Sequence, residues 1–345
     1  MSDDTDLPAS PPWSAPLLWQ GAWLSRVLTG RDRAHHALLV TGRAGIGKSV
    51  LAMNLAQGLL CEAPRDDALA CGRCAGCTYV AAGTHPDLRV LDLVDTDDDG
   101  EPKAVQEIGI KRVRALIEML EVTAHRAGRR VGVVVPAERL TTEASNALLK
   151  TLEEPPAGTT LILVAHQPGR LLRTVTSRCQ RLPAPVPTPA EAIAWLAAQR
   201  VADAPGALAE AGGAPLAALG LAEPEGRAER KAWFDALAHP ERLAPMALGA
   251  RIDAAGKDER KPRLAAGLDA LVAWTADLTR VAAGGRASRL PSYEPALAAL
   301  APRVARIALC RYHRTVLFQR AHLAHPLQPR LVAEALLADY RALFA

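Results

Sequence analysis

Hydrophobic residues in the first half of the chain follow two alternating patterns. Short continuous apolar runs lie at residues 36–41, 88–94, 131–135 and 160–165. Segments with helical spacing of apolar residues lie between them, at residues 49–60 and 110–124. Continuous apolar runs are typical of strands that helices cover on both faces. The alternation therefore predicts an α/β fold, with a parallel sheet between helices.

The pattern changes at Leu182, beyond which every second residue is a proline: Pro183, Pro185, Pro187 and Pro189. Such a stretch cannot form a helix, so it predicts a hinge or linker. The spacing beyond it is helical to the end of the sequence, and segments 263–281 and 302–322 are long enough for bundle helices. A turn-rich break at residues 223–226 divides this half. We therefore expect three domains: residues 1–182, 183–228 and 229–345.

The composition excludes several classes of protein. A hydrophobic fraction of 49% in 345 residues is enough for packed cores and excludes wholesale disorder. No apolar run approaches the ~18 residues of a membrane span, and residues 1–10 lack a secretory core, so we expect a cytoplasmic protein without membrane contact. The net charge of +4 permits only weak phosphate contacts, and 4% aromatic residues argue against a single-strand stacking platform.

A phosphate-binding loop follows the first apolar run. The pattern G-x-x-x-x-G-K-[ST] is matched in full by Gly42, Arg43, Ala44, Gly45, Ile46, Gly47, Lys48 and Ser49. Backbone N–H groups of such a loop surround phosphate oxygens, and the helix N-terminus adds its partial positive charge. Lys48 would reach the β- and γ-phosphates of ATP, and Ser49 would bind Mg²⁺. The alternative is a glycine-rich turn from strand to helix that binds no nucleotide.

Efficient hydrolysis of ATP needs more than this loop. An ATPase of this type places a carboxylate pair at the end of a neighbouring strand, where it holds Mg²⁺ and orients the attacking water. The apolar run 131–135 ends instead in Val135, Pro136 and Ala137. Glu138 lies three residues past the predicted strand and is a poor substitute. The sequence therefore predicts a chain that can hold a nucleotide and cannot cleave it efficiently.

Four of the six cysteines lie in one short segment, Cys61, Cys71, Cys74 and Cys77. Clustered thiols in a reducing compartment indicate metal ligands rather than disulfides. A closed set of four thiolates suits a structural Zn²⁺ ion, and an iron–sulfur cluster is the competing interpretation. We expect the isolated Cys179 and Cys310 to be small buried apolar residues.

Three more motifs occur in order along the chain. They are Gly83-Thr84-His85-Pro86-Asp87, the run from Asn146 to Pro156 with the sequence NALLKTLEEPP, and Ser177-Arg178-Cys179. With the phosphate loop and the cysteine segment, these motifs make the chain resemble the ATPase subunits of the bacterial DNA polymerase III clamp loader, in the AAA+ superfamily. The resemblance covers residues 35–182. It implies that a small helical lid, residues 183–228, and a helical collar for oligomerisation, residues 229–345, follow the AAA+ domain.

The resemblance also indicates which branch of the family fits. Motor subunits carry an acidic pair where this chain has Val135-Pro136, and a polar sensor residue where it has Ala165-His166. They also carry a basic sensor residue in the lid, where residues 211–215 of this chain offer none. The loss of these three features is similar to that in the stator subunit of the clamp loader. The phosphate loop of stator subunits is often degraded, whereas the loop of this chain is intact. The stator role implies no independent catalysis. It also implies that Arg178 is an arginine finger acting in trans on an adjacent ATPase.

Partners follow from the same resemblance. The expected partners are the gamma/tau motor subunits and the delta subunit, with indirect contact to the sliding clamp and weak contact to primed DNA within the complex. Two alternatives remain open: an active gamma/tau-type motor, and a phosphate-loop nucleotide kinase. We assign no role to His85 or His125. Because Pro155 and Pro156 follow, we interpret Glu153-Glu154 as a helix end rather than a catalytic carboxylate pair.

Overall fold

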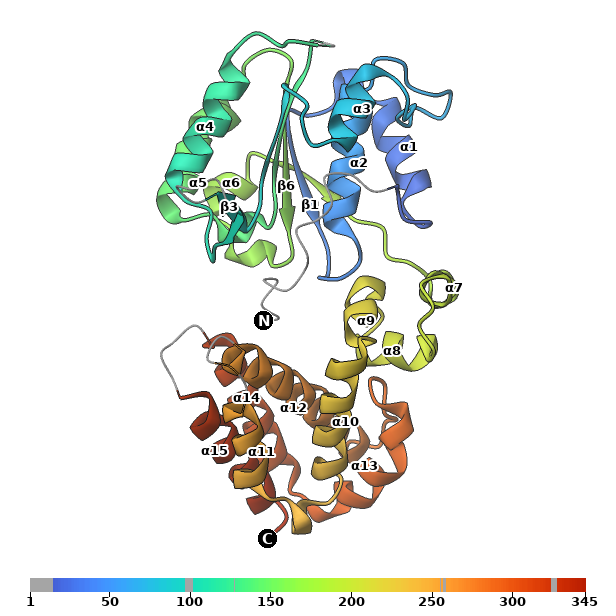
Figure 1. Ribbon diagram of the computed structural model, residues 1–345, viewed down its shortest axis with the longest axis vertical. Coiled ribbons are helices and arrows are strands. Elements are labelled where there is room, and N and C mark those ends of the chain that lie inside the picture. Colours follow the sequence, from blue (N-terminus) through green and yellow to red (C-terminus); the bar gives the residue numbers. More distant parts are fainter. Residues whose placement is uncertain (1–14, 97–101, 127, 255, 257–258, 324–327) are drawn as a thin grey trace. The chain divides into compact units, whose positions relative to one another are not determined.

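The computed structural model describes residues 15–96, 102–126, 128–254, 256, 259–323 and 328–345 (Figure 1). The described residues up to Glu191 form one compact unit, and those from Ala192 onward form a second. This division lies nine residues beyond the boundary expected at residues 182–183. Each unit has its own hydrophobic core, so each is described by itself.

A five-stranded parallel sheet forms the centre of the first unit, as the sequence predicts. The strands run in the order β2-β5-β6-β1-β7. Their bounds are β1 Ala37–Thr41, β2 Leu88–Leu91, β5 Arg130–Val134, β6 Thr159–Ala165 and β7 Gln180–Pro183. All residues of β5 and β6 are buried, which accounts for their continuous apolar sequence.

Strand β7 was not expected, because its sequence ends in the proline-rich stretch interpreted as a linker. It lies at the edge of the sheet and pairs with β1, with Pro183 opposite Thr41. An edge strand tolerates proline, since the missing N–H is not needed on the solvent side. The linker therefore begins after Pro183, directly from the sheet.

Helices cover both faces of this sheet (Figure 1). The helices α1 Gly21–Thr29, α2 Lys48–Leu60 and α3 Ala75–Ala81 lie together on one side. The other side carries α4 Ile110–Glu121, α5 Thr142–Glu153 and α6 Arg173–Thr176. Leu116 and Leu148 from α4 and α5 join Leu161 and Leu163 of β6 in one buried cluster. Layers of this kind confirm the predicted α/β architecture.

A short antiparallel pair stands apart from the main sheet. It consists of β3 Val94–Thr96 and β4 Pro102–Ala104. The acidic run 95–101 begins inside this pair, because Asp95 lies in β3. Residues 97–101 of that run lie outside the described residues.

The second unit is helical throughout its described residues. Its helices are α8 Ala204–Glu210, α9 Pro215–Leu221, α10 Pro224–Leu237, α11 Pro245–Asp253, α12 Arg260–Ala282, α13 Glu294–Leu300, α14 Arg306–Ala321 and α15 Pro329–Ala342, preceded by α7 Pro189–Ala198. The predicted bundle helices correspond to α12 and α14. No helix in the described part of the chain combines the length and apolar character that crossing a membrane requires.

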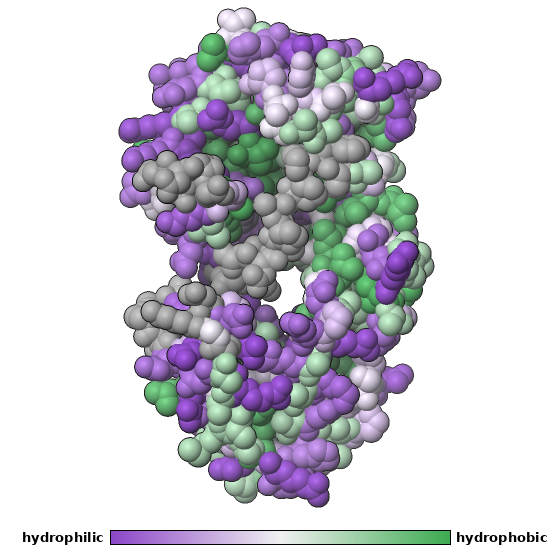
Figure 2. Space-filling view, viewed as in Figure 1, coloured by the Kyte–Doolittle hydropathy of each residue, from purple (hydrophilic) through white to green (hydrophobic). Residues whose placement is uncertain are grey.

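Two separate hydrophobic clusters occur in this second unit. The smaller one joins α7, α8 and α9 around Leu196 and Leu208. The larger one surrounds Trp274 and draws on α10 to α15. On the face shown in Figure 2, hydrophobic residues gather over the segment from α7 to α9, which is rich in alanine and leucine. The expected boundary at residues 228–229 falls inside α10, so a continuous helix lies there.

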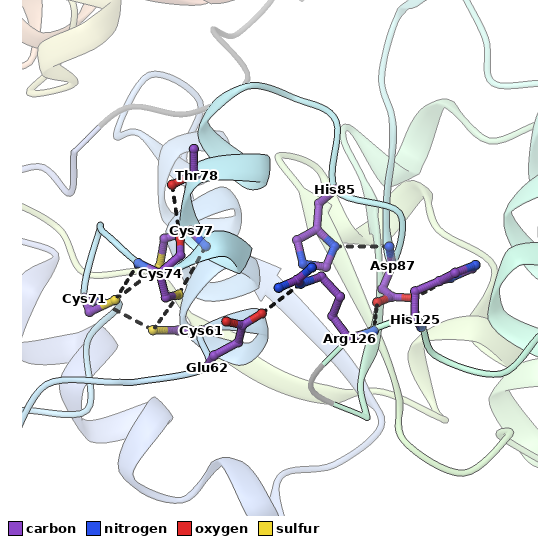
Figure 3. Close-up of polar contacts among 10 residues, drawn as sticks. All are labelled: Cys61, Glu62, Cys71, Cys74, Cys77, Thr78, His85, Asp87, His125 and Arg126. Atoms are coloured by element: carbon purple, nitrogen blue, oxygen red, sulfur yellow. Dashed lines mark hydrogen bonds and ion pairs between the residues drawn. The ribbon is translucent and has the colours of Figure 1, made fainter.

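Asp87 fastens the start of β2 to the loop between α4 and β5 (Figure 3). Only 1% of its side chain is exposed, and its two carboxylate oxygens accept hydrogen bonds from the backbone N–H groups of His125 and Arg126, both at 2.8 Å. The His125 ring adds a contact at 3.2 Å, and the His85 ring accepts the Asp87 N–H. Burial alone raises the pKa of Asp87, but these hydrogen bonds outweigh it and hold the pKa below its usual value.

Replacing Asp87 by Asn keeps one acceptor oxygen and places an amide N–H against the other backbone N–H donor. We expect Asp87→Asn to lower the free energy of unfolding by about 2–3 kcal/mol at pH 7, because hydrogen bonds to a buried charged group are lost. The stabilisation by Asp87 is present above its unfolded pKa of about 3.9 and is lost as the pH falls through its lower folded pKa. Urea unfolding at pH 7 and at about pH 3 should therefore show the difference from the natural chain shrinking in acid. The exposed Asp66→Asn is the matched control and should change stability by less than about 0.5 kcal/mol. An equal effect of both variants would contradict this role.

Candidate functional site

The phosphate loop lies at the carboxyl end of β1 and leads directly into α2. Gly45 and Gly47 have φ angles of +75° and +87°, a conformation that side-chain-bearing residues rarely adopt. Helix α2 begins at Lys48, so its N-terminal N–H groups face the loop. The strand–loop–helix context that the motif requires is therefore present.

The backbone carbonyl oxygens of the loop accept hydrogen bonds from Lys48, which belongs to the motif, and from two residues that precede α1. Lys48 is only 2% exposed, and its ammonium group donates to the Arg43 carbonyl oxygen at 2.5 Å. The Trp19 indole N–H donates to the Ile46 carbonyl, and the buried Gln20 amide donates to the Gly47 carbonyl at 2.8 Å. These contacts engage three carbonyl oxygens of the loop, those of Arg43, Ile46 and Gly47. No local sequence pattern marked Trp19 or Gln20.

The start of the linker also touches this loop. The Trp23 indole N–H donates to the Pro183 carbonyl, and the Ala184 N–H donates to the Thr41 carbonyl at 2.8 Å. A Cβ atom on Gly42 would lie 3.5 Å from that of Ala184. The start of the loop and the exit of the sheet are therefore packed together.

Strand β5 supplies no acidic pair beside the loop. Val135 and Pro136 follow its last residue, and Glu138 lies in the short helical turn Ala137–Arg139. One oxygen of Glu138 accepts the N–H groups of His166 and Gln167, both at 2.9 Å, so this carboxylate caps the end of β6. Burial and the charge of Lys48 lower the pKa of His166 to about 4, so its ring is neutral at pH 7. Glu138 and Lys48 thus both act on His166, a convergence that the sequence did not reveal.

The four clustered cysteines come together at the junction of α2 and α3 (Figure 3). Their sulfur atoms all lie within 4.8 Å of one another, so the set could hold a metal ion. Cys61 caps the end of α2, Cys74 caps the start of α3, and Cys77 lies in its first turn. Backbone N–H groups point at the sulfurs, as from Cys74 to Cys71 at 3.3 Å. The Arg73 N–H lowers the pKa of Cys71 to about 6, and burial raises that of Cys77.

The cysteine cluster is attached to its surroundings by close packing and one ion pair (Figure 3). A Cβ atom on Gly76 would lie 2.7 Å from the Leu60 carbonyl oxygen, so α3 can approach α2 only through glycine there. Glu62 pairs with Arg126 at 2.8 Å, and Arg126 lies over the ring of Tyr79. His85 and His125, to which the sequence assigned no role, both contact Asp87 beside this cluster.

Arg178 lies in the turn between α6 and β7. Its side chain is 35% exposed and forms an ion pair with Glu153 at 2.5 Å. It also donates to the Thr174 carbonyl at 2.9 Å. The helix-ending interpretation of Glu153 is correct, because Glu153 is the last residue of α5, but the ion pair was not foreseen.

The two isolated cysteines differ from each other. Cys179 is half-buried, and burial raises the pKa of its thiol to about 11. Cys310 is exposed on α14, so the prediction that it is buried is wrong. The surrounding sequence is rich in apolar residues, but residue 310 lies on the side of α14 that faces away from the buried Leu309 and Tyr312.

Comparisons with known proteins bear on the residues that contain the phosphate loop, the cysteine cluster and Arg178. Residues 24–186 match the family model described as "DNA polymerase III, delta subunit". "DNA polymerase III subunit delta'" of Pseudomonas aeruginosa is 43% identical over 208 residues, which cover 59% of this chain and 60% of that protein. "DNA polymerase III subunit delta'" of Escherichia coli (strain K12) is 38% identical over 211 residues, which cover 60% of each protein.

A second type of subunit also matches. "DNA polymerase III subunit tau" of Salmonella typhimurium is 35% identical over 147 residues, which cover 43% of this chain and 21% of that protein. The chain spans about 60% of the length of the delta' relatives above. Over about 60% of its length this chain is homologous to the delta' subunits, and its residues 24–186 are similar to the family described as "DNA polymerase III, delta subunit".

Proposed function

We propose that this chain is a delta-prime subunit of the DNA polymerase III clamp loader, a stator that helps load the sliding clamp onto primed DNA. Its partners would be the gamma/tau motor subunits and the delta subunit, with the clamp contacted indirectly and DNA weakly. The observation that carries the proposal is the carboxyl end of β5, where Val135 and Pro136 stand beside an intact phosphate loop. A gamma/tau-type motor needs an acidic pair at that position.

The phosphate loop supports nucleotide binding, and the residues around it argue against turnover. Glu138 is the acidic residue near the end of β5, and its carboxylate already caps β6. A neutral His166 stands where the motor subunits of the family carry a polar sensor. ATP bound by Lys48 and Ser49 with Mg²⁺ would therefore remain largely uncleaved.

The isolated protein is expected to bind ATP with Mg²⁺ and to hydrolyse it at least about 100-fold more slowly than a motor subunit, because the Mg²⁺-holding carboxylates are missing. Equilibrium binding of a fluorescent ATP analogue and steady-state phosphate release measure the two properties. Lys48→Ala should abolish binding and leave clamp loading by the reconstituted complex nearly unchanged. Turnover at a motor-like rate, removed by Lys48→Ala, would show that the chain is a motor. Phosphorylation of a nucleoside monophosphate would favour the kinase.

We propose that Arg178 is an arginine finger that acts in trans. The loop follows β1 and Arg178 precedes β7, and these strands are parallel neighbours with Leu38 opposite Gln180. The phosphate loop and Arg178 are therefore at opposite ends of the strands, about 20 Å apart along the strand direction at about 3.3 Å per residue. That distance is longer than an arginine side chain. A nucleotide that Arg178 reaches would belong to a neighbouring subunit.

Arg178→Ala should leave folding and assembly unchanged and abolish rapid hydrolysis at the one ATP site that Arg178 faces. Arginine fingers contribute about 10³–10⁵-fold to such steps. Rapid-quench measurement of the reconstituted complex should show that the hydrolysis burst loses the share of one site. Arg173→Ala, which removes an exposed arginine of α6, is the control. A full burst with the Arg178→Ala subunit would exclude the finger.

The two separate hydrophobic clusters of the second unit support the part of this proposal that concerns a lid and a collar. We propose that the smaller cluster belongs to the lid expected at residues 183–228 and the larger cluster to the collar expected from residue 229 onward. Apolar side chains of Ile307, Leu317 and Phe318 are exposed on α14. Exposed apolar residues on a collar helix fit packing against other subunits.

We propose that the cysteine cluster holds a structural Zn²⁺ ion. Four sulfurs at ~2.3 Å from zinc in a tetrahedron lie about 3.8 Å apart. The pairs Cys61–Cys74 and Cys71–Cys77 are each separated by 3.9 Å. All four ligands come from the chain, so the ion would stabilise the junction of α2 and α3 without taking part in catalysis.

The protein purified without chelators should contain about one zinc ion per chain, measured by elemental analysis. Cys71→Ser should lose most of this zinc and lower the thermal unfolding midpoint, because one of four ligands is gone. Cys310→Ser, a change at an exposed thiol outside the cluster, should keep it. Visible absorption of an iron–sulfur cluster, or equal zinc content in both variants, would contradict the assignment.

A further inference from the structure

We infer that Glu153 is a positioning residue for Arg178. The ion pair between them holds the guanidinium at the end of α5, ready for the phosphate of a neighbouring subunit. The inference rests on the proposed role of Arg178 as a finger. It adds a second residue to that role, in a motif that the sequence explains only as the end of a helix.

Two contacts from different elements fix the guanidinium. Glu153, the last residue of α5, meets one terminal nitrogen at 2.5 Å. The Thr174 carbonyl, in α6, meets the other at 2.9 Å. Because a guanidinium is planar, restraints on both terminal nitrogens set the direction in which the group faces.

The restrained guanidinium can still bind an anion. It has five N–H donors, and a carboxylate oxygen and a carbonyl oxygen occupy only part of that set. The side chains of Arg178 and Glu153 are 35% and 51% exposed, so a phosphate brought by another chain can reach them. An arginine already held in one orientation loses less rotamer freedom when the transition state forms. The ion pair therefore serves the chemical step more than the binding of ATP.

The position of Glu153 follows from the sequence around it. Pro155 prevents α5 from continuing, so the helix ends at Glu153. Glu154 is the next residue and is also exposed, and the ion pair of Arg178 is made by Glu153. The two adjacent glutamates thus provide a test residue and a matched control of equal charge.

The test uses the complete clamp-loader complex, reconstituted with motor subunits and each variant of this chain. Rapid-quench experiments measure the burst phase that Arg178→Ala removes, over a range of ATP concentrations. Glu153→Gln should slow this phase about two- to fivefold, the factor that corresponds to one exposed ion pair. The ATP concentration at half-saturation should stay within about twofold. Glu154→Gln should match the natural chain.

A double-variant cycle separates positioning from stability. In the Arg178→Ala background, Glu153→Gln should have no further effect, since its partner is absent. An equal loss with and without Arg178 would mean that Glu153 acts only on structure, and a faster burst would mean that it holds the arginine back. An unchanged burst with Glu153→Gln overturns the inference and leaves the finger standing. An unchanged burst with Arg178→Ala overturns both.

Discussion

The parallel direction of the five strands is the constraint on which the arrangement of the first unit depends. All five strands point the same way, so their carboxyl ends share one edge and their amino ends the other. The phosphate loop, Glu138 and His166 lie at the carboxyl ends of the strands. Arg178 and Glu153 lie at the amino ends. The phosphate loop and Arg178 of one chain therefore lie too far apart to meet each other.

The cysteine cluster and Asp87 attach the segment between α2 and β2 to its neighbours. The cluster joins the end of α2, which begins at the phosphate loop, to α3. Asp87 then ties the strand after α3 back to the loop before β5. The segment between α2 and β2 is thus fixed at both ends, once by thiols and once by a buried carboxylate. This segment begins at the end of α2 that is opposite to the phosphate loop.

The sequence predicted the parts of this arrangement that are contiguous or periodic. Four strands, the phosphate loop and the cysteine cluster depend on local spacing, and the structure has them where that spacing placed them. It could not predict contacts between distant segments, such as Gln20 with Gly47 or Glu153 with Arg178. Strand β7 was not predicted because it ends in Pro183, and a proline-rich sequence was interpreted as a linker rather than as an edge strand. Cys310 was misplaced because an apolar neighbourhood does not say which side of a helix faces the core.

The contact between Gly42 and Ala184 places the root of the linker against the phosphate loop. Pro183 is held by Trp23, and Ala184 by Thr41, so this stretch moves with the sheet and α1 rather than as a free tether. A change in loop conformation on ligand entry would press first on the chain that leaves for the helical unit. The phosphate loop and the start of the linker thus share one set of contacts, so neither backbone can change without disturbing the other.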